Sequence, residues 1–201
     1  MSTYVLVHGG KKTGEIWDKV VPLLQQHDNK VFCPTLPDPY KHTLQDHIQE
    51  VCHLITDKGL NKVVLVGHSY AGMVITGVAD NMPEKLSRLI YVDAAVPENG
   101  QSLFDILNGT GHDAQKYFGI EPLRPFTDPL IFDAEKIQKI RKTYILCTES
   151  EFIKVSKPTF DKLNAVPKDE NWVTYEINSH HPVMVEHPKE LTDIFLKIEA
   201  S

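Results

Sequence analysis

A serine stands where it could act as a nucleophile. The segment from Val63 to Gly72, VVLVGHSYAG, passes from four apolar residues into a turn of small residues around Ser69, and a helix can follow at once. A turn of this kind between a buried strand and a helix holds a serine hydroxyl at the carboxyl end of a sheet. Small residues are needed beside the serine because two backbone segments approach closely there. Gly67 meets this need and Ala71 stands where glycine is more usual, but a serine that only caps a helix would also fit.

A second turn could supply hydrogen-bond donors to a reacting carbonyl. The apolar run Val5 to Val7 ends at His8-Gly9-Gly10. Acyl transfer develops an oxyanion on the carbonyl oxygen, and backbone N–H groups in a glycine turn can hold it without reorganising. We predict that these donors are the N–H groups of Gly10 and Tyr70, the latter being the residue after the serine. The alternative is a glycine turn that merely ends a strand.

A base could come from the end of the chain. The last apolar run is followed by NSHHPVMVEHP, residues 178–188, which contains His180, His181 and His187. Histidine changes its charge near neutral pH, so it can accept a proton from a serine and return it later. The chain has 10 histidines, and their residue type alone does not select one.

These side chains need a scaffold, and the pattern of the chain predicts an α/β fold with a doubly wound, mainly parallel sheet of about six strands. Unbroken apolar runs suit strands that are covered on both faces, and amphipathic stretches between them suit crossover helices. The predicted strands are Tyr4 to Val7, Lys30 to Cys33, Val63 to Val66, Leu89 to Val92, Tyr144 to Cys147 and Trp172 to Ile177. The predicted helices are Ile16 to Leu24, Leu44 to Ile55 with Thr43 as N-cap, Ala71 to Ala79 and Glu190 to Ile198.

One region interrupts the alternation. Residues 97–140 contain many Gly, Pro and Asp residues and no clear strand, although Leu103, Ile106 and Leu107 could form a short helix. An excursion of this kind above a regular core is usually a lid or a binding loop. We predict a single domain over residues 1–201 with a lid insertion at about 97–140. In this lid Phe104, Leu107, Tyr117, Phe118 and Phe126 could line an apolar pocket, although core or lid packing explains them equally well.

Composition excludes several classes of protein. The chain has 27 acidic and 21 basic residues and a formal net charge of -6, so we expect no nucleic-acid partner. It has no apolar stretch near the roughly 18 residues of a membrane span, so we expect no membrane association. Cys33, Cys52 and Cys147 form no CxxC pair, which predicts free thiols and a cytoplasmic location. The Cys and His spacings show no zinc pattern, and we expect neither a metal nor an organic cofactor.

At this point the chain resembles the α/β-hydrolase superfamily, in particular the branch of plant methyl esterases, hydroxynitrile lyases and small bacterial relatives. The resemblance extends over nearly the whole chain. It rests on His8-Gly9-Gly10, on Gly67 to Gly72, on LIYVDAAVP at residues 89–97, on YILCTE at 144–149 and on a closing His-x-x-Met. In that pattern the histidine three residues before the methionine is catalytic. The resemblance therefore implies His181, which precedes Met184, as the base.

The resemblance places the acid of the triad just after the fifth strand, where this chain has Ser150 between Glu149 and Glu151. A serine carries no charge to stabilise an imidazolium. We predict Asp93 as the acid instead, because it ends the strand beside the one that bears Ser69 and because a strand end is more rigid than a loop. Certain haloalkane dehalogenases resemble this arrangement. Glu149 and Glu151 are the alternatives, and Asp128 and Asp133 are more remote ones.

Together these residues predict a serine hydrolase that cleaves small carboxylic esters through an acyl-enzyme on Ser69. Its expected partner is a small-molecule ester, and its oligomeric state stays open. One alternative is a carbon–carbon lyase of the hydroxynitrile type, but those enzymes have lysine and threonine where this chain has Pro182 and Gly9. The other is a catalytically weak, hydrolase-like receptor or binding protein, which the serine at position 150 would favour.

Overall fold

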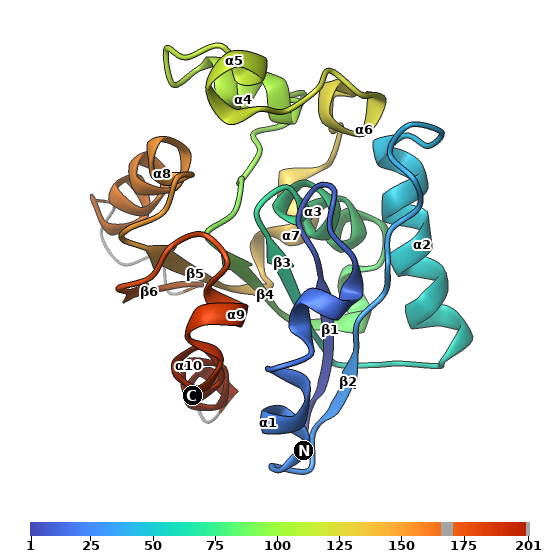
Figure 1. Ribbon diagram of the computed structural model, residues 1–201. Coiled ribbons are helices and arrows are strands. Elements are labelled where there is room, and N and C mark those ends of the chain that lie inside the picture. Colours follow the sequence, from blue (N-terminus) through green and yellow to red (C-terminus); the bar gives the residue numbers. More distant parts are fainter. Residues whose placement is uncertain (166–170, 200–201) are drawn as a thin grey trace.

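The structure is a computed structural model that describes residues 1–165 and 171–199. Its centre is a six-stranded sheet with the order β2-β1-β3-β4-β5-β6, and every pairing in this sheet is parallel (Figure 1). The strands are β1 (Thr3–Val7), β2 (Lys30–Phe32), β3 (Val63–His68), β4 (Leu86–Val92), β5 (Arg141–Cys147) and β6 (Trp172–Ile177). Each strand overlaps the apolar run that predicted it, so the predicted α/β fold is confirmed.

Helices cover both faces of the sheet. One face carries α2 (Leu44–Asp57), α3 (Ala71–Asn81) and α8 (Ile153–Ala165), and the other carries the 3₁₀ helix η1 (Gly14–Trp17), α1 (Val21–Gln25), α9 (Val183–Glu186) and α10 (Pro188–Glu199). A second 3₁₀ helix, η2 (Pro83–Lys85), precedes β4. Alternate side chains of a strand point to opposite faces. Val5 and Leu65 accordingly belong to the apolar layer under α2 and α3, whereas Leu6 and Val66 belong to the layer under α1 and α10.

The helix predictions have mixed outcomes. The Thr43 hydroxyl accepts a hydrogen bond from the Asp46 N–H at 3.1 Å, so the predicted N-cap of α2 is confirmed. The prediction of one helix from Ile16 to Leu24 is wrong, because the chain forms η1, a turn and then α1. Pro22 explains the break: proline has no N–H to donate and fits only the first turn of a helix, so a helix must begin just before it.

Four short helices occupy the connection between β4 and β5. They are α4 (Leu103–Asn108), α5 (Ala114–Phe118), α6 (Arg124–Thr127) and α7 (Ala134–Gln138). In Figure 1, α4, α5 and α6 lie above the carboxyl ends of the strands. Helix α7 packs against α3 instead. The predicted short helix at Leu103 to Leu107 is confirmed as α4. Because the strands are parallel, their carboxyl ends lie along one edge of the sheet, on the side of α4, α5 and α6 (Figure 1).

Two kinds of feature are missing from the described residues. None of the helices within 1–165 and 171–199 is long and apolar enough to cross a membrane. Over the same ranges, no group of three or more His, Cys, Asp and Glu side chains is arranged to hold a metal ion.

Candidate active site

Ser69 lies in a sharp turn between β3 and α3. Its φ of 58° falls in the left-handed region, which a serine adopts only at a cost. Backbone hydrogen bonds hold it there: the Ser69 N–H donates to Val92 O at 3.2 Å, and Ser69 O accepts from Ala95 N–H at 3.1 Å. The turn needs small neighbours, because a Cβ at Gly72 would lie 1.8 Å from Ala95 O. The sequence therefore places Gly72, rather than residue 71, at the closest approach.

The His8-Gly9-Gly10 turn lies directly beside the serine. A Cβ at Gly9 would be 3.0 Å from the Cβ of Ser69. The Leu36 N–H donates to His8 Nε2 at 2.9 Å, so the proton of this imidazole is on Nδ1, which donates to Gly9 O at 2.7 Å. Burial lowers the pKa of His8, which keeps it neutral. Because the Gly9–Gly10 peptide is trans, the Gly10 N–H points away from the Gly9 carbonyl, which accepts the bond from His8.

His181 lies in the loop between β6 and α9, and its ring packs beside the serine turn. The ring centroid is 4.4 Å from that of His68, the residue directly before Ser69, and 5.1 Å from that of Phe152. His68 Nε2 donates to His181 O at 2.9 Å. Burial holds the pKa of His68 well below its usual value, so His68 is a neutral donor here. The His181 side chain is 23% exposed, so it is open on one side.

The carboxylate beside His181 belongs to Asp93. Asp93 follows β4 with a φ of 44°, is fully buried, and its Oδ2 accepts a hydrogen bond from His181 Nδ1 at 2.6 Å. The hydroxyl of Ser150 donates to the same oxygen. Since Nδ1 carries its proton toward Asp93, the other ring nitrogen of neutral His181, Nε2, is left as a proton acceptor.

The other predicted acids do not reach this ring. Glu149 contributes a backbone N–H to Ser179 O, and its side chain is exposed. Glu151 accepts from the backbone N–H of His181 at 3.4 Å rather than from the ring. Asp128 pairs with Arg124 at 3.5 Å, and Asp133 caps α7. Of the five carboxylates predicted as candidates, the described structure brings Asp93 alone to the imidazole.

Tyr70 follows the serine and is held from two sides. Its hydroxyl donates to His47 Nδ1 at 2.9 Å, while His47 Nε2 donates to Pro37 O at 3.0 Å. Burial lowers the pKa of His47 to about 4, so this imidazole is neutral at pH 7. On the other side, the ring of Phe126 from α6 stands edge-on to Tyr70 at a centroid distance of 4.8 Å. Gly10, Tyr70 and Phe126 line a cavity of about 30 Å³.

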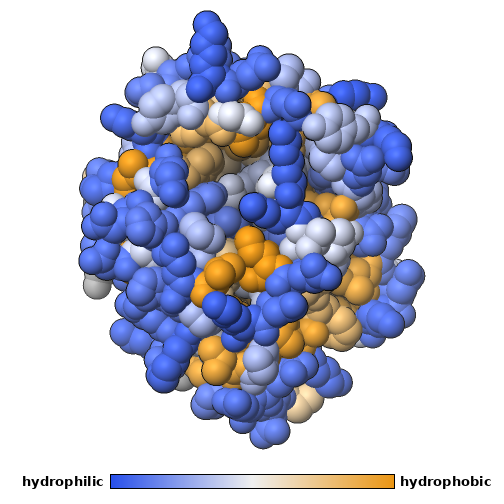
Figure 2. All heavy atoms as spheres, viewed as in Figure 1, coloured by the Kyte–Doolittle hydropathy of each residue, from blue (hydrophilic) through white to orange (hydrophobic). Residues whose placement is uncertain are grey.

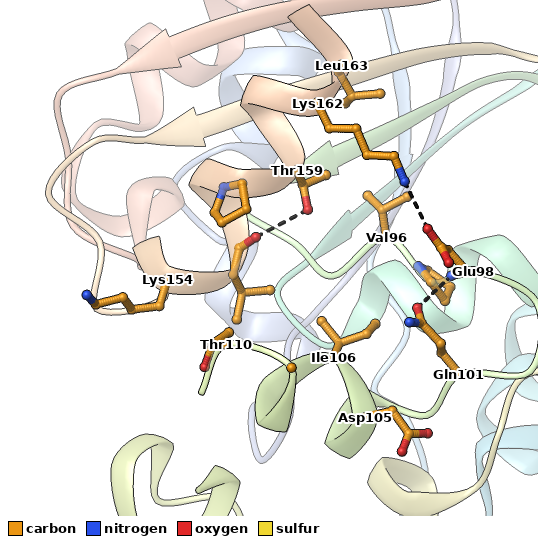
Figure 3. Close-up of a pocket in the computed structure, with 14 residues that line it drawn as sticks. Val96, Glu98, Gln101, Asp105, Ile106, Thr110, Lys154, Thr159, Lys162 and Leu163 are labelled. Carbon is orange, nitrogen blue, oxygen red and sulfur yellow. Dashed lines mark hydrogen bonds and ion pairs between the residues drawn. The ribbon is translucent and has the colours of Figure 1, made fainter. Parts of the chain in front are cut away.

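The surface is hollowed between the α4–α6 helices and the body of the molecule (Figure 2). A separate cleft of about 500 Å³ lies between α4 and α8, with Ile106 and Thr159 on its two sides and an ion pair between Lys162 and Glu98 at 2.9 Å (Figure 3). None of the predicted site residues lines that cleft.

Sequence reasoning missed four contacts of this site. Ser150 and Phe152 follow β5, which ends at the same sheet edge as β4, so their place after a strand was an available signal. His68 is adjacent to Ser69 in the chain. His47 lies on an apolar helix face among buried residues, which is the one hint that it packs inward.

The other two histidines of the segment 178–188 have other partners. His180 pairs with Glu186 at 3.1 Å, and His187 pairs with Glu190 at 3.8 Å.

The chain is similar in sequence to known esterases. Residues 4–126 match the model of the alpha/beta hydrolase family. The carbendazim hydrolyzing esterase of Nocardioides sp. (strain SG-4G) is 40% identical over 115 residues, which are 53% of this chain and 48% of that protein. The polyneuridine aldehyde esterase of Rauvolfia serpentina is 33% identical over 109 residues, 50% of this chain and 41% of that one. The chain thus spans less than half the length of these curated relatives.

Solved structures share the fold. An extracellular alpha/beta-hydrolase from a Paenibacillus species superposes with a TM-score of 0.80 at 21% identity, covering 98% of both chains. A pyrethroid hydrolase from Sphingobium faniae gives a TM-score of 0.80 at 17% identity, covering 100% of this chain and 98% of the other. With more than half of its residues matching the family model and the same fold throughout, the chain belongs to the alpha/beta hydrolase family.

Proposed function

We propose that the chain is a carboxylic ester hydrolase that attacks small esters with Ser69, with His181 as the base and Asp93 as the acid. The observation that carries the proposal is the hydrogen bond of 2.6 Å from His181 Nδ1 to the buried Asp93, beside the turn that bears Ser69. That bond holds the imidazole as the tautomer whose Nε2 can accept a proton. The names of the relatives, carbendazim hydrolyzing esterase and polyneuridine aldehyde esterase among them, support ester hydrolysis.

The proposed reaction has two steps. In the first, His181 Nε2 takes the proton of the Ser69 hydroxyl as its oxygen attacks the ester carbonyl carbon, and the N–H groups of Gly10 and Tyr70 hold the oxyanion. His181 then protonates the departing alcohol, which leaves an acyl-enzyme. In the second, His181 takes a proton from water as the water attacks the acyl carbonyl carbon. The bond from that carbon to Ser69 Oγ then breaks, His181 returns the proton to Ser69, and the carboxylic acid leaves. Asp93 stabilises the imidazolium in both steps, and neither step needs a metal or a cofactor.

We also propose that residues 97–140 act as a lid of a single domain that spans residues 1–201. Contacts made by two residues of this segment support the lid. Phe126 packs against Tyr70 and the position of Gly10, and Glu121 accepts hydrogen bonds from Lys11 Nζ at 2.8 Å and from the Tyr40 hydroxyl at 2.6 Å. Lys11 directly follows Gly10, so the segment from 97 to 140 is tied to the proposed oxyanion turn. A cytoplasmic location and a small-molecule ester as partner remain predictions.

The alternatives have less support. The missing charge at position 150 favours a catalytically weak receptor or binding protein, but the buried carboxylate of Asp93, at the end of another strand, bonds to His181. For the lyase, Pro182 follows His181 directly, so no lysine stands next to the base.

Hydrolysis of p-nitrophenyl acetate, butyrate and octanoate tests the proposal, together with labelling by a fluorophosphonate probe. The wild type should hydrolyse the short esters fastest and become labelled, and Ser69→Ala should lose both properties. Ser87→Ala is a matched control, because the Ser87 hydroxyl bonds to Lys62 O at 3.0 Å, away from the site. A wild type that is folded but neither hydrolyses nor labels would refute the proposed function.

A further inference from the structure

Ser150 makes hydrogen bonds that its residue type alone does not predict. It lies in the turn between β5 and α8 and is 4% exposed. Its Oγ bonds to Asp93 Oδ2, lies 3.3 Å from His181 Nδ1, and accepts from the Phe152 N–H at 2.9 Å. One hydroxyl therefore touches both partners of the proposed acid–base pair and is itself held by the backbone of the next turn.

The direction of each of these bonds follows from counting donors. An ionised carboxylate can only accept, so the bond between Ser150 and Asp93 uses the proton of the hydroxyl. The Phe152 N–H occupies one lone pair of Oγ and keeps that proton turned toward Asp93. His181 Nδ1 directs its own proton to the same oxygen, at 2.6 Å. Asp93 Oδ2 thus receives two donors.

The environment of Asp93 makes the second donor important. The carboxylate is fully buried, and its other oxygen, Oδ1, has no hydrogen-bond partner among the described residues. A buried charge is costly unless hydrogen bonds compensate it. Of the two side chains that donate to Oδ2, His181 changes its protonation during the proposed reaction, whereas Ser150 does not.

From this geometry we infer that Ser150 is a positioning residue: it fixes Asp93 Oδ2 against His181 Nδ1 while His181 gains and loses its proton. The inference rests on the proposed function and deepens it. Ser150 acts through Asp93 and needs no contact with the substrate.

A double-mutant cycle tests this inference, with kcat and KM measured on p-nitrophenyl acetate for the wild type, Ser150→Ala, Asp93→Asn and the double variant. A hydrogen bond to a charged group supports a loss of kcat of about tenfold or more for Ser150→Ala, with KM changed less than about twofold. Once Asp93→Asn has removed the charge, adding Ser150→Ala should change kcat less than about twofold, because coupled residues are not additive.

Two further variants separate positioning from folding. Ser150→Thr keeps the hydroxyl and should regain most of the lost kcat. Ser150→Cys keeps nearly the volume of serine but is a weak donor, so it should lose kcat without losing thermal stability. Ser156→Ala is the control: it removes another buried hydroxyl, which bonds to Phe152 O at 3.2 Å and not to Asp93, and it should leave kcat unchanged.

The possible failures are distinguishable. If Ser150→Ala and Ser150→Cys keep the kcat of the wild type, or if Ser150→Ala lowers kcat by the same factor with and without Asp93→Asn, the inference is wrong and the proposed function stands. If the wild type shows no hydrolysis that depends on Ser69, the proposed function itself fails.

Discussion

Ser69 and Asp93 share a backbone conformation that non-glycine residues seldom adopt, with φ values of 58° and 44°. Each follows a central strand of the sheet, and each is fixed by backbone bonds to a neighbouring strand: the Asp93 N–H donates to Ile145 O at 2.7 Å. A left-handed residue costs roughly 1 kcal/mol. Both side chains belong to the proposed site, which fits the tendency of such conformations to gather where a side chain must be aimed.

The positions of Asp93 and Ser150 around one ring nitrogen lead to a prediction about single residues. Because both side chains lie within 3.3 Å of His181 Nδ1, a carboxylate from either position should reach it. Asp93→Ser should lower kcat by roughly 10³-fold or more, since it removes the charge that stabilises the imidazolium. The exchange variant Asp93→Ser with Ser150→Asp has the same composition as the wild type and should regain at least tenfold over Asp93→Ser in kcat on p-nitrophenyl acetate. An exchange variant no faster than Asp93→Ser would show that the two positions are not equivalent about Nδ1.

For single residues, the sequence predicts the charged and nucleophilic side chains of the site better than the residues that hold them in place. Ser69 stands in a turn with a recognisable pattern, and the rigid end of β4 favours Asp93 as the acid, which the structure places next to His181. Ser150, His68 and His47 are different. Each acts through a hydrogen bond whose partner is distant in the chain; Ser150 and Asp93, for example, are 57 positions apart. Nothing local to a serine or a histidine signals that partner.

At the scale of elements, the packing of α3 on the segment after β4 sets the position of the serine turn. Gly72 lies in the first turn of α3, where a Cβ would meet the Ala95 backbone oxygen at 1.8 Å. Gly72→Ala should therefore push the helix away and destabilise the fold by at least about 1–3 kcal/mol, the usual cost of overpacking. Urea denaturation measures this loss. Gly109→Ala is the control, because its Cβ would come no closer than 3.1 Å to another atom. Equal stabilities of the two variants would contradict the prediction.

The strands could be predicted because the central ones are covered on both faces and so consist of unbroken apolar residues. Helix α8 could not, for a physical reason: only Val155 and Ser156 among its residues are buried, and Pro158 lies within it. Its apolar side is too narrow to give a clear helical period. The helices α5, α6 and α7 have four or five residues each, which is too short for a periodic signal.

For the whole molecule, buried neutral histidines link stability to pH. His8, His47 and His68 are all buried, and burial lowers the pKa of each. The pKa of His47 is 6.5 in the unfolded state and about 4 in the folded state. At a pH between these values, His47 binds a proton in the unfolded state and stays neutral in the folded state. The free energy of unfolding should therefore fall as the pH falls through this range, by about 2 kcal/mol from pH 7 to pH 5 for His47 alone.

Urea denaturation at pH 7 and pH 5 checks this pH dependence. His47→Gln removes the titrating group, so its free energy of unfolding should depend on pH less steeply than that of the wild type by about the same 2 kcal/mol. His53→Gln, on the exposed side of the same helix, should keep the pH dependence of the wild type. The same slope in the His47→Gln variant as in the wild type would rule out this origin of the effect.

The two ends of the described chain meet on the side of the molecule opposite the α4–α6 helices (Figure 1). The amino group of Met1 is 3.7 Å from the Glu199 carboxylate, at the edge where the parallel strands begin. A tether joined to the Met1 amine would therefore hold the molecule on a bead or an electrode with the α4–α6 side facing the solution. Coupling through the Lys11 side chain, which bonds to Glu121, would instead turn the α4–α6 side toward the support.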